Sequence, residues 1–313
     1  MADVLNRVAM IALNAYREAV RARVLYGLLA LALASCAYSL VVGTLSLHQE
    51  QRVVADLGAA SISLYTIMVA IVLGATSLHR ELELKTIFPI LTRPLRRHEY
   101  LVGKYLGTLG TLAVFIALDG GAVLGILALE AGQKVSLVVG ASVLLAIILA
   151  VMLVSARFTR VFVVIPWSFA LFAAMALLAA PAGGERQLVL ASAALTLMEA
   201  MIVTAVATLF ASFSSPFLTA IFTIGVFLVG RSADTLANLP ARYFGQTIHE
   251  IGRALSHVVP NLNVYVPPRA LLLGQVIDAP VWSFVGAAGV QAILCSTLLL
   301  ALGALIFRKR DFE

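Results

Sequence analysis

Long apolar runs, each of roughly 20 residues, fill most of this sequence and constrain its fold more than any other feature. A helix of about 20 apolar residues spans the hydrocarbon core of a bilayer, and only helices or closed barrels satisfy their backbone groups there. The chain is 61% hydrophobic and only 12% charged, whereas soluble domains carry about 25% charged residues. The sequence therefore predicts an all-α, polytopic integral membrane helix bundle.

Eight candidate spans follow one another in a single transmembrane domain over residues 1–313. Short polar segments separate them, so each run is bounded by residues that belong in water. The seventh span follows the turn at 212–216 and runs to about Gly230. The other seven candidates cover about 24–47, 58–78, 105–129, 135–156, 161–182, 188–211 and 281–307.

The Lys and Arg residues orient these spans. Most of the 22 lie near the N-terminus, in segment 79–104, at Arg157 and Arg160, or at the C-terminus. The order of spans places all four regions on one side, and a positive excess marks the cytoplasmic side. We therefore expect both termini in the cytoplasm. The basic residues lie in gaps between apolar runs, so the lipid bilayer, and no nucleic acid, is the expected partner.

Two further segments are predicted to form helices that do not cross the membrane. Residues 3–22 are apolar at helical spacing with Arg7 and Arg21 on the opposite face, which predicts an interfacial amphipathic helix. The alternative is an N-terminal extension of the first span. Residues 231–279 predict an extracytoplasmic loop with short interfacial or re-entrant helices, because its apolar stretches are too short to cross a bilayer.

Two acidic residues lie near the middle of predicted spans, Asp119 in the third and Glu199 in the sixth. An acid at that depth costs about 2.5–3.5 kcal/mol, so each side chain should face the bundle interior or a wet cavity. The two interpretations are a cavity residue that contacts a substrate or cation, and a hydrogen bond that fixes helix packing.

Several kinds of chemistry are not expected in this chain. The sequence contains no G-x-x-x-x-G-K-[ST] motif, so we expect no ATP bound through a P-loop. The five His residues lack metal-ligand spacing, and Cys36 and Cys295 fall within spans, so neither a metal site nor a disulfide framework is predicted. We expect no enzyme activity and no cofactor in this chain. Glycines in the third span (Gly103, Gly107, Gly110) and the last span (Gly286, Gly289) are spaced for close helix packing.

The polar stretch from 79 to 107 carries a resemblance to the membrane permeases of ATP-binding-cassette (ABC) type-2 exporters. In that family an acidic-Thr segment, an (S/T)-R-P-x-x-R element and a G-K pair join the second and third spans. The matching residues here are Glu81, Glu83, Thr86, Thr92-Arg93-Pro94, Arg97 and Gly103-Lys104. Segments 209–216, 259–263 and 307–312 also resemble family features. The family usually has six spans, so residues 135–182 form an additional pair.

The resemblance implies a bacterial inner-membrane permease that forms a homodimer and binds two copies of a separate ABC ATPase subunit. ATP and Mg²⁺ would be bound by that ATPase. Residues 79–104 would form the cytoplasmic coupling loop that the ATPase contacts. The residues expected to couple to it are Glu81, Glu83, Thr86, Phe88, Leu91, Arg93 and Arg97.

Two alternatives remain for the function. In the first, the chain is an energy-coupling subunit that drives an extracytoplasmic accessory protein without moving a substrate itself. In the second, it is an ion-coupled secondary transporter that uses Asp119 and Glu199. The substrate of an exporter also stays open among a lipid-linked glycan, a peptide, a drug and an ion.

Overall fold

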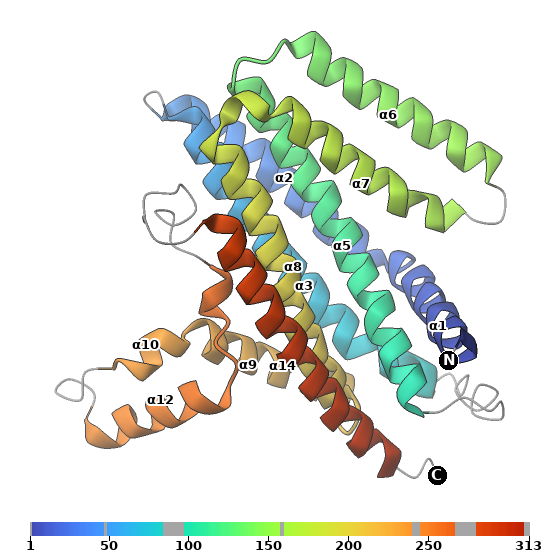
Figure 1. Ribbon diagram of the computed structural model, residues 1–313, viewed down its shortest axis with the longest axis vertical. Helices are drawn as coiled ribbons and strands as arrows, with labels where there is room; N and C mark the ends of the chain where they lie inside the picture. The colour runs from blue at the N-terminus through green and yellow to red at the C-terminus, as the bar shows by residue number, and fades with distance from the viewer. Residues whose placement is uncertain are drawn as a thin grey trace.

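The computed structural model describes most of the chain as a bundle of α-helices (Figure 1), with no strand among the described residues. Seven helices in these residues are long and apolar enough to cross a membrane. The described residues are 2–46, 49–83, 97–156, 160–239, 245–266 and 280–309. The seven helices are α2 (Arg23–Leu45), α3 (Glu50–Glu83), α5 (Arg97–Glu130), α6 (Val135–Ser155), α7 (Arg160–Leu178), α8 (Gly184–Ala211) and α14 (Val281–Lys309).

The seventh predicted span forms a helix close to its predicted bounds, but this helix is too short to be counted as a span. Helix α9 (Pro216–Arg231) has 16 residues, which gives it a length of roughly 24 Å. The hydrocarbon core is about 30 Å thick, so α9 does not cross it alone. The helix begins where Ser215 caps its first turn and Pro216 takes the position at which a missing N–H costs nothing.

Helices α3, α5 and α8 form the centre of the bundle, with α14 and α2 beside them (Figure 1). Glycine allows two of these contacts. A Cβ on Gly58 of α3 would lie 2.3 Å from Val123 of α5, and one on Gly74 would lie 2.5 Å from Ala207 of α8. The backbones therefore approach to distances that a larger residue would prevent.

The additional pair of spans, α6 and α7, forms a hairpin at the edge of the bundle (Figure 1). Helix α7 packs against α5, while α6 contacts mainly α7. Trp167 of α7 donates a hydrogen bond from Nε1 to the Leu145 carbonyl of α6 at 2.8 Å. Helix α7 continues into a short 3₁₀ turn, η1 (Ala180–Ala182), so the predicted span 161–182 ends there.

Residues 3–22 are helical as predicted: α1 covers Ala2–Val20. Its buried residues Ala15 and Tyr16 pack against α5, where a Cβ on Gly107 would lie 2.4 Å from the Ala12 carbonyl oxygen. Gly103 is similarly close to α1, whereas Gly110 lies in ordinary contact with Tyr16. The first two glycines of the predicted seam thus permit close packing. The interfacial position of α1 stays a prediction.

The two ends of the described chain lie at the same end of the bundle, and α3 ends and α5 begins there too (Figure 1). We call this the terminal end. The predicted coupling loop joins α3 and α5. Its residues Thr86, Phe88, Leu91 and Arg93 lie outside the described residues. Glu81, Glu83 and Arg97 fall on the helix ends, and their side chains are not described.

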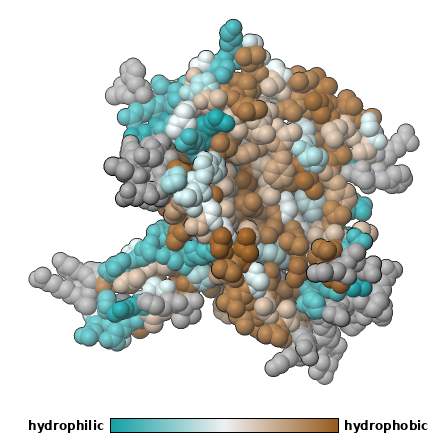
Figure 2. Space-filling model, viewed as in Figure 1, coloured by the Kyte–Doolittle hydropathy of each residue, from teal (hydrophilic) through white to brown (hydrophobic). Residues whose placement is uncertain are grey.

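The segment after α9 contains α10 (Ala233–Ala237), α12 (Gln246–Val258) and the short 3₁₀ turn η2 (Asn263–Tyr265). Helices α10 and α12 extend away from the bundle (Figure 1), and hydrophilic residues gather over them while hydrophobic residues cover much of the bundle (Figure 2). Asn261 and Asn263 donate hydrogen bonds to the two carboxylate oxygens of Asp234, each at 2.7 Å. These bonds fix the chain after α12 to α10.

Candidate functional site

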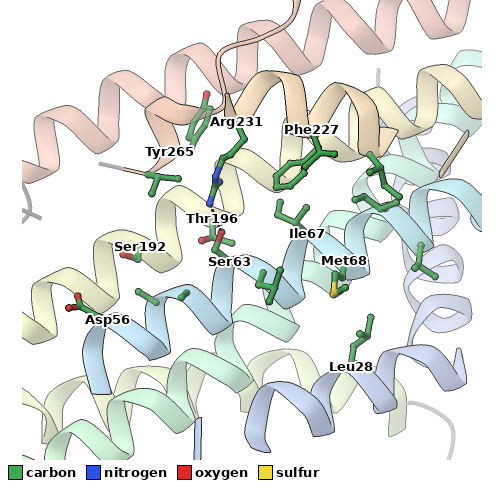
Figure 3. Close-up of a pocket in the computed structure, with 18 of the residues that line it drawn as sticks. Leu28, Asp56, Ser63, Ile67, Met68, Ser192, Thr196, Phe227, Arg231 and Tyr265 are labelled. Carbon is green, nitrogen blue, oxygen red and sulfur yellow. Dashed lines mark hydrogen bonds between the residues drawn. The ribbon is translucent and has the colours of Figure 1, made fainter. Parts of the chain in front are cut away.

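A groove of about 730 Å³ lies between α2, α3, α8, α9 and the η2 turn (Figure 3). Helix α3 forms its longest wall. The lining residues of α3 recur every three or four positions, as one helix face requires. They are Asp56, Ala59, Ala60, Ser63, Leu64, Ile67, Met68, Ile71 and Val72. From Asp56 to Val72 this wall is roughly 24 Å long at 1.5 Å per residue.

The opposite face of α3 faces the interior of the bundle. Ile62, Thr66 and Ala70 are fully buried there, while Leu64 and Met68 on the groove face stay about half exposed. One helix therefore has two different apolar faces. Its sequence alone does not separate them, because both faces consist of apolar and small residues.

The polar and apolar residues of the groove occupy different ends (Figure 3). Asp56, Ser63, Ser192, Thr196 and Arg231 lie between one end of the groove and its middle, a part that we call the polar end. Apolar residues line the other, among them Leu28, Ile67, Met68 and Phe227. Because α3 runs toward the terminal end, the apolar part of the groove is the part nearer that end.

An ion pair between Arg231 and Glu199 stands at the polar end. Glu199 lies in the middle of α8 and is fully buried, and Nη1 of Arg231, the last residue of α9, donates to its Oε1. Nη2 of Arg231 donates to Ser63 Oγ of α3 at 3.2 Å. A buried carboxylate needs such a partner, because an unpaired charge costs several kcal/mol. The ion pair joins α9 to α8, and the hydrogen bond to Ser63 joins α9 to α3.

The arginine also faces the groove. Its side chain is 28% exposed, and its guanidinium carbon lies 5.7 Å from the centre of the Phe227 ring, within the range of a cation–π contact. In the sequence, Arg231 is only the first charged residue of the predicted extracytoplasmic segment 231–279. Its pairing with a residue 32 positions away has no signal in the sequence, because only the packing of α9 against α8 brings the two together.

Asp119 lies elsewhere. It is fully buried in α5 and accepts a hydrogen bond from Ser61 Oγ of α3 at 3.2 Å. Ser61 and Ser63 point to different sides of α3, since two residues apart on a helix face away from each other. Asp119 does not line the groove, and Glu199 reaches it through Arg231. The role of each acid in function stays a prediction.

A second polar cluster lies near the terminal end, where α1, α3 and α5 meet. The Lys104 ammonium lies 3.0 Å from Glu18 Oε2 of α1 and donates to the Ser77 carbonyl of α3, also at 3.0 Å. Arg7 of α1 forms an ion pair with Glu99 of α5 at 3.3 Å. The Gly-Lys pair of the sequence therefore serves two contacts: Gly103 admits α1, and Lys104 joins it to α3.

The described residues form a helical bundle whose seven long apolar helices indicate a multi-pass membrane protein, with a groove along some of these helices. No group of three or more metal-ligating side chains occurs among the described residues. Both cysteines are free thiols. Comparison of the chain with models of known families and with curated proteins gave no match.

Proposed function

We propose that this chain is the membrane permease subunit of an ABC exporter, which couples ATP hydrolysis by a separate ATPase subunit to export of a substrate held in the groove. The resemblance of segment 79–107 to the coupling region of type-2 permeases supports the ATPase partner. Within this proposal the chain lies in the bacterial inner membrane with both termini in the cytoplasm, and a second copy completes a homodimer.

The observation that carries the proposal is the course of α3. This single helix of 34 residues lines the groove from Asp56 to Val72 and continues to Glu83. The proposed coupling loop begins where it ends. A continuous helix transmits displacement along its axis, so a push at its end by an ATPase moves the groove wall directly. Helix movements of this kind are a known way to switch between conformations.

The cluster around Lys104 supports the same mechanism. It connects α3 and α5, which flank the proposed coupling loop, to α1. A displacement of the loop therefore acts on three helices together. Farther along α3 from the loop, the Arg231–Glu199 pair and the Arg231–Ser63 hydrogen bond connect α3 to α8 and α9. Movement of α3 along its axis changes the geometry of that junction and of the groove beside it.

The test is purification of the affinity-tagged full chain from its native membranes, followed by identification of bound proteins by mass spectrometry. We expect an ATPase with a P-loop to co-purify, and the reconstituted complex to hydrolyse ATP. Charge reversal by Glu83→Lys or Arg97→Glu should reduce the bound ATPase at least tenfold. Lys134→Glu, at the turn between α5 and α6 away from the terminal end, is the matched control. Undiminished co-purification with both reversals contradicts the proposed docking site, and absence of any ATPase contradicts the function.

A further inference from the structure

The shape of the groove indicates the class of molecule that it holds. The part along α3 from Leu64 to Val72 is apolar, and nine residues of helix give it a length of roughly 14 Å. Half of a hydrocarbon core about 30 Å thick has nearly the same length. A groove of this length and lining matches the length of one extended hydrocarbon chain.

The opposite end of the groove offers hydrogen bonds in addition to apolar surface. A guanidinium has five N–H donors, and Glu199 and Ser63 accept from two of those of Arg231. Ser192 and Thr196 of α8 line the same end with hydroxyl groups. Donors and hydroxyls at this density suit a headgroup rich in oxygen atoms.

The charge of this end narrows the headgroup further. The positive charge of Arg231 is balanced by Glu199, which is fully buried and bound to it directly. An anionic headgroup would gain no net Coulomb attraction from this neutral pair and would lie near the Glu199 carboxylate. The balance therefore favours an uncharged, hydroxyl-bearing headgroup.

We propose that the groove binds a single-chain amphiphile with an uncharged, oxygen-rich headgroup, which lies beside Arg231 while its hydrocarbon chain extends along α3 toward Val72. This inference rests on the proposed function, because it names the substrate class of the exporter. A second copy of the chain fits the polar end less well. An apolar helix placed there would offer no hydrogen-bond partner to the hydroxyl groups of Ser192 and Thr196 or to the N–H groups of Arg231 that Glu199 and Ser63 do not use, which is costly in a membrane.

The probe is monopalmitoylglycerol with a photoactivated diazirine at the middle of its chain. The purified full chain is labelled in phosphatidylcholine nanodiscs, which contain no single-chain neutral amphiphile besides the probe, and the labelled peptides are mapped by mass spectrometry. We expect label on the groove residues of α3 and α9. Unlabelled monopalmitoylglycerol should compete at least tenfold better than the single-chain anion lysophosphatidic acid. Better competition by the anion overturns the headgroup assignment.

Two matched tryptophan variants separate the groove from lipid bound around the bundle. Ala60 lines the groove and is exposed, so Ala60→Trp fills it without disturbing the core. Ala146 is exposed on α6, outside the groove. We expect Ala60→Trp to reduce labelling at least tenfold and Ala146→Trp to leave it unchanged. Label spread over α6 and α14, and unaffected by Ala60→Trp, overturns the proposal.

Two further measurements keep the result interpretable. Met68→Phe fills the groove partly at an exposed position and should reduce labelling by a smaller factor, so the proposal does not depend on one variant. The oligomeric state of each variant is measured by light scattering. Dissociation of a dimer by Ala60→Trp with unchanged labelling assigns the groove to a second copy and overturns the proposal. No ATPase is present in these assays, so their failure leaves co-purification, and with it the proposed function, unaffected.

Discussion

Helices α6 and α8 are both long enough to span a membrane, yet they occupy opposite environments. Helix α6 is the most hydrophobic of the seven spanning helices, and of its residues only Val138 is buried. Helix α8 is among the least hydrophobic of them, and fifteen of its residues are buried, including Glu199. Hydropathy and burial are therefore inverted between the two.

This inversion of hydropathy and burial arises because the solvent around the spanning helices is lipid. Lipid chains are as apolar as leucine, so an apolar surface gains little by leaving them. Helices associate in a membrane through close packing and polar contacts, which small and polar residues provide. The buried residues of α8 include Ala191, Ala193, Ala200, Ala205, Ala207 and Ala211. In this bundle the most hydrophobic helix is the one left facing outward.

The largest expected effect tests whether the exposed side of α6 faces lipid. Ile147 lies near the middle of α6 and is 55% exposed. A lysine at the centre of a lipid-facing helix costs about 2.5–3.5 kcal/mol on insertion, so Ile147→Lys should greatly reduce the inserted fraction of the chain. Protease protection of α6 in membranes measures it. Ile147→Leu is the control and should behave as wild type. Normal insertion of the lysine variant means that water or protein covers this face.

A smaller effect compares a glycine in the tightly packed contact between α3 and α8 with a glycine on the exposed surface of α6. Gly74→Leu forces α3 away from Ala207 of α8, and overpacking of this kind costs about 1–3 kcal/mol. Gly140 of α6 has no atom within 4 Å of an added Cβ. Gly140→Leu should therefore change stability by less than about 0.5 kcal/mol. Thermal unfolding in maltoside micelles compares the two, and equal melting temperatures contradict the central position of the α3–α8 contact.

The smallest effect concerns the contact between Ser61 and Asp119. Hydrogen bonds between membrane helices average about 0.6 kcal/mol in double-mutant cycles. We expect a coupling free energy of that size from Ser61→Ala, Asp119→Ala and the double variant, measured by unfolding. Transport measured on the same variants separates the two interpretations of Asp119. Zero coupling together with lost transport assigns Asp119 to the substrate rather than to packing.

The positions of the spans were predictable, and most of the contacts between them were not. Predicted spans 135–156 and 281–307 agree closely with α6 and α14, because an uninterrupted apolar run has clear ends. The predicted span 58–78 begins eight residues after α3 does, since the charged first turns of α3 do not look like part of a membrane helix. The bounds of α9 agree with the predicted segment, but counting that segment as a span was wrong, because its 16 residues are fewer than a crossing helix needs.

The candidate site shows the same division. Asp119 and Glu199 were noticed because a charge inside an apolar run is visible in the sequence. Neither the groove nor the arginine that faces it was noticed. Arg231 follows an apolar helix at a position where a charge is unremarkable, and its partner is 32 residues earlier. The glycines 103 and 107 were noticed by their spacing, but their contact with α1 was not.

By itself, the sequence determined that this chain is a bundle of membrane helices, where most of them begin and end, and which residues are too polar to face lipid. These properties depend on local composition and on the thickness of a bilayer. The tertiary structure alone decided which helices form the centre, that α9 stops beside the middle of α8, and that Arg231 faces a groove with a polar and an apolar end. The physical reason is that the spanning helices are apolar over most of their surface, so hydropathy does not distinguish the face toward lipid from the face toward another helix.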